Sequence, residues 1–332
     1  MKLKYLLDNN PCNEGNINFE YVLESLLICT AMTLKERAIM QSVQPGILAE
    51  ETRLARYLLF SISSVADIPT ALQDLQANID TRTTVVGLGQ SLISCLDKSI
   101  PGLHVLPAHS VKGIDVPSTP VALWCWLRGS DRGEIFHRSR FIENLLMPAF
   151  MLDDVVDSFQ YDNNHDLSGY EDGTENPVGE DAINAAVVQD ASDAMNGSSF
   201  VVFQQWVHDF DHLDDMTTEQ QDNIIGRHIH DNEEFDEAPE SAHVKRAAQE
   251  SFDPEAFLLR RSMPWADGSN GGLAFVAFGH SLQAFESIMD RMLGNEDGIS
   301  DALFEFTRPI SNACFWCPPV SDGRINLSEL GL

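Results

Sequence analysis

The segment Gly169–Pro177, GYEDGTENP, places one carboxylate, that of Asp172, inside a loop. Gly169 and Gly173 flank this carboxylate, and glycine allows a backbone to adopt positive φ or to approach a bulky ligand closely. Pro177 prevents a helix from continuing through the segment. By itself such a loop could be an ordinary turn in an acidic protein. Its chemical meaning therefore depends on the residues that accompany it.

Two downstream residues complete a possible reaction centre: His243, in SAHVKR, and Arg260, in RRSMPW. A histidine that ligates haem iron is a neutral imidazole whose second ring nitrogen donates to a carboxylate or a carbonyl. A carboxylate in a dry pocket can take a proton from one peroxide oxygen and return it to the other. Burial raises the pKa of that carboxylate, so it needs a nearby cation to stay ionised. An arginine remains charged and also stabilises negative charge on the departing oxygen.

The order of these residues resembles the dye-decolorizing peroxidases, and within them class B, also called P-type. The similarity covers roughly residues 42–320 and includes the segments WVHDF, IIGRH and FTRPISNACFW. It implies an enzyme that contains haem b (iron protoporphyrin IX) and uses hydrogen peroxide. Such an enzyme oxidises dyes, phenolic compounds and other small reducing substrates through a ferryl intermediate. The alternative is a haem-binding or haem-handling protein with incidental peroxidase activity, which would need His243 but not the Asp172–Arg260 pair.

The resemblance also implies a role for each site residue. Asp172 and Arg260 are the distal acid–base pair, and His243 is the axial ligand of the haem iron. Arg260 is preferred to Arg261 because the family pattern Arg-x-Ser/Asn-x-Pro then places Ser262, a possible partner for peroxide or water, third. The remaining expected contacts are Gly173 and Thr174 in the loop, Leu273 and Phe275 as apolar walls, and Asp301, which either pairs with His243 or charges a helix N-terminus.

Other histidines and acids give weaker signals. His208 and His212 stand four residues apart, as a metal pair on a helix would, but His208 closes a strand-like run and HDFDH is not a zinc-protease motif. The acids and amides of 162–166 suggest calcium. However, Leu167 stands where a calcium loop needs glycine, and Gly173 stands where it needs glutamate. We therefore expect no metal site from either group.

Composition restricts the partners. The chain of 332 residues carries 51 acidic and 21 basic residues, for a formal charge of −30. Such a polyanion repels phosphate backbones and anionic lipid, so we expect no nucleic-acid or membrane partner. The six cysteines favour a reducing, cytoplasmic location. Only Cys314 and Cys317 have CxxC spacing, which without a second pair argues against a zinc ribbon and indicates redox use only weakly.

Hydrophobic patterns predict an α+β protein, and the resemblance implies two ferredoxin-like domains, antiparallel sheets with helices packed on them, in the dimeric α+β barrel-like arrangement of the family. The expected divisions are an N-terminal extension 1–41, domains 42–155 and 156–320, and a C-terminal tail 321–332. Strands are predicted at 56–62, 121–129, 198–210 and 271–279, a strand running into a helix at 83–96, and helices at 71–80, 133–147, 217–228 and 282–294.

Several expectations concern the ends and the assembly. Translation starts at Met1 or at Met40, where a more typical N-terminus begins. The tail is expected to fray, although it could dock into an encapsulating shell protein, and we expect a homo-oligomer. Trp and Tyr residues could relay electrons to bulky substrates, but buried aromatics are more often core residues. The candidate relays are Trp124, Trp126, Trp206, Trp265 and Trp316.

Overall fold

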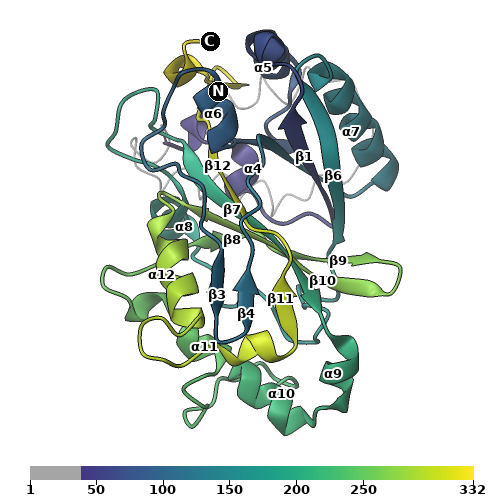
Figure 1. Cartoon of the computed structure of the whole chain (residues 1–332), viewed down its shortest axis with the longest axis vertical. Coiled ribbons are helices and arrows are strands. Elements are labelled where there is room, and N and C mark those ends of the chain that lie inside the picture. Colours follow the sequence, from purple (N-terminus) through teal and green to yellow (C-terminus); the bar gives the residue numbers. More distant parts are fainter. Residues whose placement is uncertain (1–38) are drawn as a thin grey trace, which may run out of the picture. The chain divides into compact units, whose positions relative to one another are not determined.

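The computed structural model describes residues 39–332, and strands from both halves of this segment form one sheet (Figure 1). A further pairing between its strands β7 and β10 closes eight of the ten strands of this sheet into a ring, and every pairing in the ring is antiparallel. The spatial order of the ten strands is β11 (Thr307–Pro309), β7 (Ser199–His208), β12 (Ala313–Cys317), β2 (Thr84–Leu88), β5 (Leu123–Gly129), β1 (Leu54–Ile62), β6 (Phe150–Phe159), β9 (Met263–Asp267), β10 (Asn270–Gly279) and β8 (Leu259–Arg260).

Aromatic side chains fill the interior of the ring. Alternate residues of a strand point to the same face, so one face of each strand supplies the filling. Tyr57 of β1 stacks on both Trp124 and Trp126 of β5, with centroid separations of 6.0 and 6.4 Å. Gly87 of β2 leaves room for these rings, because a Cβ there would stand 2.7 Å from Phe315. Burial of the tryptophans confirms the core interpretation for the group Trp124, Trp126, Trp206, Trp265 and Trp316.

Helices cover the outside of the ring. Helices α5 (Ile68–Asn78) and α7 (Arg132–Leu146) pack beside the first-half strands, and α12 (Gln283–Met292) packs against β10 (Figure 1). Helix α7 begins at Asp131, whose carboxylate accepts from the Glu134 N–H. Gly294, with φ +73°, follows α12 in the left-handed region that favours glycine.

Smaller elements complete the described chain. They are helices α4 (Pro45–Leu48), α6 (Gln90–Cys95), α8 (Gly179–Ala186), α9 (Phe210–Asp215), α10 (Thr218–Ile225) and α11 (His243–Arg246), 3-10 turns at Val65–Asp67, Gln249–Ser251, Ala302–Glu305 and Ser328–Leu330, and two hairpins, β3 (His109–Val111) with β4 (Ile114–Val116) and β13 (Val320–Ser321) with β14 (Arg324–Ile325).

The expected strands and helices are present, but the ends of the chain differ from expectation. The extension 1–41 and the choice between Met1 and Met40 fall almost wholly outside the described residues. The C-terminal tail does not fray, because Ile325, Leu327 and Leu330 are buried in the main core. A division into two ferredoxin-like halves remains our proposal. Its boundary would follow β6, which runs through residue 155 without a break.

The CxxC segment forms part of strand β12. Residues three apart on a strand point to opposite faces, so Cys314 and Cys317 are held apart as free thiols. Burial raises the pKa of both thiols, that of Cys314 to about 12. A buried thiol with a raised pKa is a poor nucleophile, which agrees with the weak redox signal of the motif. Among the described residues, no helix has both the length and the apolar character needed to cross a membrane.

Candidate active site

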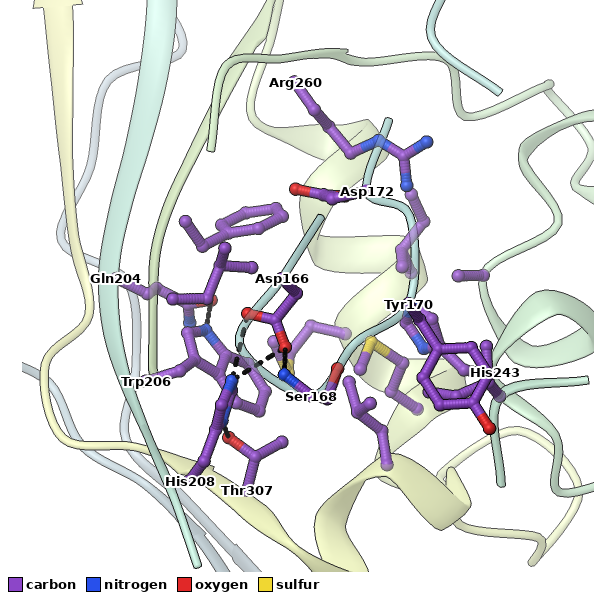
Figure 2. Close-up of a pocket in the computed structure, with 18 of the residues that line it drawn as sticks. Asp166, Ser168, Tyr170, Asp172, Gln204, Trp206, His208, His243, Arg260 and Thr307 are labelled. Atoms are coloured by element: carbon purple, nitrogen blue, oxygen red, sulfur yellow. Dashed lines mark hydrogen bonds and ion pairs between the residues drawn. The ribbon is translucent and has the colours of Figure 1, made fainter. Parts of the chain in front are cut away.

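A pocket lies against the outer faces of β7 and β10 and beside α12 (Figure 2). Its cavity volume is about 160 Å³. Leu273 and Phe275, two residues apart on β10, point into this space, while Ala274 between them faces the ring. Helix α12 supplies further apolar wall, namely Phe285, Ile288, Met289 and Met292. Both predicted wall residues therefore line the pocket.

His243 begins the short helix α11 and lines the pocket. Its Nδ1 lies 2.8 Å from the Asp301 carboxylate, whose side chain is fully buried. With Nδ1–H donating to Asp301, Nε2 carries a lone pair, which is the state in which an imidazole binds a metal. Asp301 also accepts from the Leu303 N–H at the start of the following 3-10 turn. Asp301 therefore pairs with His243 and also lies at the N-terminus of a helical turn, so its contacts agree with both interpretations left open by the sequence.

A buried arginine fixes the position of helix α11. Arg246, one turn after His243, makes two hydrogen bonds of 2.8 and 2.9 Å to the Asp297 carboxylate. Its remaining bond goes to the Arg291 carbonyl, near the end of α12. Hydrogen bonds from Arg246 and the Ile299 N–H lower the pKa of Asp297 to about 2, so this pair stays charged. The arrangement fixes the imidazole relative to α12.

Asp172 and Arg260 lie together on another side of the same pocket (Figure 2). Burial raises the pKa of Asp172 above its ordinary value, while the Arg260 guanidinium and the Gly173 N–H act in the opposite direction. The Arg260 Nε is buried without a hydrogen-bond partner among the described residues, so this guanidinium is available to an anion. Arg261, the residue after β8, is absent from the pocket lining, which supports the choice of Arg260.

Asn176 joins the loop of Asp172 to the strand of Arg260. Its Nδ2 donates to the Arg260 carbonyl at 2.8 Å, and its Oδ1 accepts from the Arg260 N–H at 2.8 Å. One side chain thus satisfies both backbone groups of Arg260, as a partner strand would. The sequence analysis did not assign this role to Asn176. An Asn-Pro step at the end of a glycine loop was the available signal.

A second attachment of the loop involves a buried ion pair. Asp166 accepts from His208 Nε2 at 3.0 Å and from the Ser168 N–H at 2.9 Å. His208 Nδ1 lies 2.7 Å from Thr307 Oγ1, whose own proton goes to the Val207 carbonyl, so Nδ1 must donate. Burial alone would raise the pKa of Asp166, but the hydrogen bonds from His208 and Ser168 lower it below its ordinary value. Both ring nitrogens of His208 therefore donate.

The third attachment runs to helix α10. Tyr170 donates from its hydroxyl to Asp222 Oδ1 at 2.7 Å, and Asp222 also accepts from the Ile229 N–H. The loop that carries Asp172 is thus tied to β7 through Asp166, to α10 through Tyr170 and to β8 through Asn176. Asp172 lies between the last two of these residues in the sequence. None of these attachments was predicted, because each joins residues that are distant in the sequence. His208 and His212, considered as a metal pair, lie on different elements, β7 and α9.

Three predicted residues occupy other positions. Ser262 faces a smaller cavity on the far side of Asp172, and its Oγ accepts from the Val276 N–H at 3.2 Å. Gly173, with φ +81°, lines the same small cavity. Thr174 is exposed and accepts from Asn232, so its side chain does not line the pocket. The expected contact of Thr174 with the cofactor is therefore not supported by its position.

The pocket suits the cofactor expected from the sequence. A planar macrocycle needs apolar walls, and β10 and α12 provide them. An iron at its centre needs one imidazole with a free nitrogen on one face, which His243 provides. Its open face would meet a carboxylate and an unpartnered guanidinium, those of Asp172 and Arg260. The residues that are present fit haem.

Comparison with known proteins gives the same assignment. Residues 163–322 match the family model described as Dyp-type peroxidase, C-terminal. A dye-decolorizing peroxidase of Rhodococcus erythropolis is 27% identical over 333 residues, which cover 88% of this chain and 98% of the relative. This chain belongs to the Dyp-type peroxidase family. A dye-decolorizing peroxidase of Mycobacterium tuberculosis is 28% identical over 210 residues, which cover 61% of this chain and 63% of that protein.

Solved structures share the fold of this peroxidase. The dye-decolorizing protein from V. cholerae is 26% identical, with a TM-score of 0.75 over 82% of this chain and 96% of that protein. A DypB variant from Rhodococcus jostii RHA1, solved in complex with heme, has a TM-score of 0.77 at 24% identity, over 82% of this chain and 95% of that protein. The family, the α+β barrel-like fold and the enzyme type, a haem peroxidase, agree with the expectations from the sequence.

Proposed function

We propose that this protein is a class B dye-decolorizing peroxidase in which His243 holds the haem iron, Asp172 moves the peroxide proton and Arg260 stabilises developing negative charge. One observation carries the proposal: Asp172, Arg260 and His243 line one pocket although they come from a loop, a strand and a helix. A protein that only handled haem would need the His243–Asp301 pair. It would have no use for a buried acid beside an unpartnered guanidinium.

Bound haem would supply the iron that binds peroxide and gives two electrons to the O–O bond. The protein has to move one proton. Ionised Asp172 takes it from the oxygen nearer the iron and returns it to the farther oxygen, which leaves as water. The Arg260 guanidinium stabilises both the ionised Asp172 and the charge on the departing oxygen. Ser262, in the adjoining small cavity, would hydrogen-bond water or peroxide approaching Asp172 from that side.

The finer assignments are also proposals. Small reducing compounds, phenols and dyes would return the enzyme to its resting state. Self-association is supported by exposed apolar side chains on α7, directly after it and on β6, namely Phe136, Phe141, Met147 and Met151. We propose a cytoplasmic homo-oligomer. Docking into a shell protein would require release of the tail, whose apolar residues pack against this chain's own core.

Rapid mixing of the holoenzyme with hydrogen peroxide tests the proposal. We expect Asp172→Asn to slow the spectral change of the haem by about 10²- to 10⁴-fold, the usual contribution of a positioned acid–base group. His243→Ala should change the axial ligation seen by electron paramagnetic resonance. His230→Gln, which removes an exposed imidazole, is the control and should change neither property. Wild-type rates in both Asp172→Asn and Arg260→Leu would refute the mechanism.

A further inference from the structure

The distal carboxylate borders two cavities. Asp172 and Arg260 line the large pocket, and both also line a smaller, polar cavity of about 20 Å³. A polar cavity of that size accommodates about one water molecule. Beyond Asp172, the small cavity is bordered by Ser262, His165 and, from a distant part of the chain, Glu51. Glu51 is the second carboxylate on this cavity.

The backbone on each side of Glu51 is anchored. Before it, the buried Arg128 donates through Nη2 to the carbonyls of Ala49 and Glu50. After it, Thr52 Oγ1 accepts from the Gly129 N–H at 3.1 Å and donates to the Leu54 carbonyl. Arg128 and Gly129 lie at the end of β5, and Leu54 is the first residue of β1. The position of the Glu51 carboxylate at the cavity is therefore fixed by the ring of strands.

The Glu51 carboxylate forms no direct ion pair with a described residue. Arg261 and Arg128 are its nearest cations in electrostatic effect, yet no described residue forms a hydrogen bond or an ion pair within 4.0 Å with Glu51. A partly buried carboxylate without a protein partner completes its hydrogen bonding with water, and the small cavity is where that water can lie. A role only as counter-ion to Arg261 would predict direct contact.

We propose that Glu51 is a proton-relay residue that exchanges protons between solvent and Asp172 through water in the small cavity. This inference rests on the proposed function of Asp172. In the proposed mechanism Asp172 returns the peroxide proton, so exchange with solvent is needed when resting Asp172 is protonated and must lose its proton before it can act as a base. That proton has to leave without passing through the pocket that the cofactor fills. The small cavity offers that route, because Asp172 separates it from the large pocket.

The electrostatic setting suits an exchange of protons. Burial raises the pKa of Glu51, Arg261 and Arg128 oppose this, and ionised Asp172 adds to it. Because ionised Asp172 raises the pKa of Glu51, a proton on Glu51 is favoured while Asp172 is ionised. The other titratable or charged groups beside Glu51 or lining the cavity are Tyr57, Tyr161, His165 and Arg260, whereas Glu50 acts on Arg261 and does not line the cavity.

Glu51→Gln tests the relay, with Glu50→Gln as matched control because Glu50 is exposed and carries the same charge one residue earlier. We expect Glu51→Gln to slow the peroxide reaction of the holoenzyme by about 10-fold, less than the roughly 10²- to 10⁴-fold of a group that contacts the reacting atoms, because Glu51 acts through Asp172. Its solvent deuterium isotope effect should increase, and added formate or acetate should restore part of the rate. Glu50→Gln should match the wild type in all three respects.

A second measurement does not depend on turnover. The rate at which ferric holoenzyme binds hydrogen cyanide also requires a proton to leave the ligand, and its pH profile should lose one titration in Glu51→Gln. Wild-type profiles and isotope effects in Glu51→Gln, with Asp172→Asn still slowed, would overturn the relay alone. If Asp172→Asn were not slowed, the proposed function would fail instead. An effect confined to His165→Gln would assign the relay to His165 and refute Glu51.

Discussion

Asn176 and Arg260 are joined by two hydrogen bonds, both of 2.8 Å, between one side chain and one backbone unit. The bonds connect the loop that carries Asp172 to the edge strand β8. Because Asn176 lies only one turn of chain beyond Asp172, the separation of the acid from the guanidinium is set by covalent geometry and these two bonds. The reacting pair is thus positioned through the backbone.

Asn176→Ala should loosen this pair. The substitution leaves the Arg260 N–H without its partner and leaves the Arg260 carbonyl with only the longer bond from Arg261 Nη1, and an unpaired buried group typically costs about 1–3 kcal/mol. A displacement of about 1 Å at a reaction centre can cost about 100-fold in rate, so we expect the peroxide reaction to slow by 10- to 100-fold with haem retained. Rapid mixing checks the rate. Asn163→Ala, an exposed change in the preceding loop, should behave as wild type.

The pH dependence of the peroxide reaction should report Asp172. Its pKa is raised by burial, and the base form is the one that accepts the peroxide proton. The rate should therefore increase as pH rises through this raised pKa and then level off. Arg260→Leu removes the main opposing charge, so the rising limb should move to higher pH. Arg260→Lys keeps a charge and should move it less. Identical limbs in all three proteins would show that another group controls the profile.

Residues that belong to one local pattern could be selected from the sequence, and Asp172, His243 and Arg260 line one pocket in the structure. Asp172 and Gly173 share a loop, His243 follows a small residue, and Arg260 stands at a fixed spacing from Ser262. Thr174 was predicted as a contact by its place in the same loop. It is exposed because the backbone turns at Gly173, where φ is +81°. Local spacing did not reveal the direction in which the side chain points.

Long-range pairs could not be predicted in the same way. Asp166 and His208 are 42 residues apart, and Asn176 and Arg260 are 84 apart. Strand periodicity identified β7 and β10 separately, but their pairing, which closes the ring, depends on packing between distant segments. Glu51 appeared to be one acid among 51 acidic residues. Its place in the lining of the small cavity, together with Asp172, shows that it reaches the distal side.

Asp172→Asn should make the folded protein more stable at neutral pH while it removes activity. The pKa of Asp172 is raised in the folded state, so the folded protein binds this proton more tightly than the unfolded chain does. The resulting stabilisation of the folded state is complete only below the ordinary pKa of 3.8. The stability contribution is lost as pH rises through the raised value, and ionised Asp172 then costs folding free energy. Thermal unfolding of the holoenzyme should show a higher midpoint for Asp172→Asn at pH 7. The difference should disappear in acid; an unchanged midpoint at pH 7 would contradict the expectation.

Asp301→Asn should separate the two functions of Asp301. Asparagine caps a helix about as well as aspartate, so the bond to the Leu303 N–H and the fold should persist. The negative charge beside His243 Nδ1 is lost, however, and a neutral partner makes the imidazole a weaker electron donor to iron. We expect a higher ferric/ferrous midpoint potential and a weaker iron–histidine stretch in resonance Raman spectra, with an unchanged unfolding midpoint. Asp290→Asn removes an exposed carboxylate from α12 and serves as the control. An unfolding midpoint that falls while the potential stays constant would assign Asp301 to capping alone.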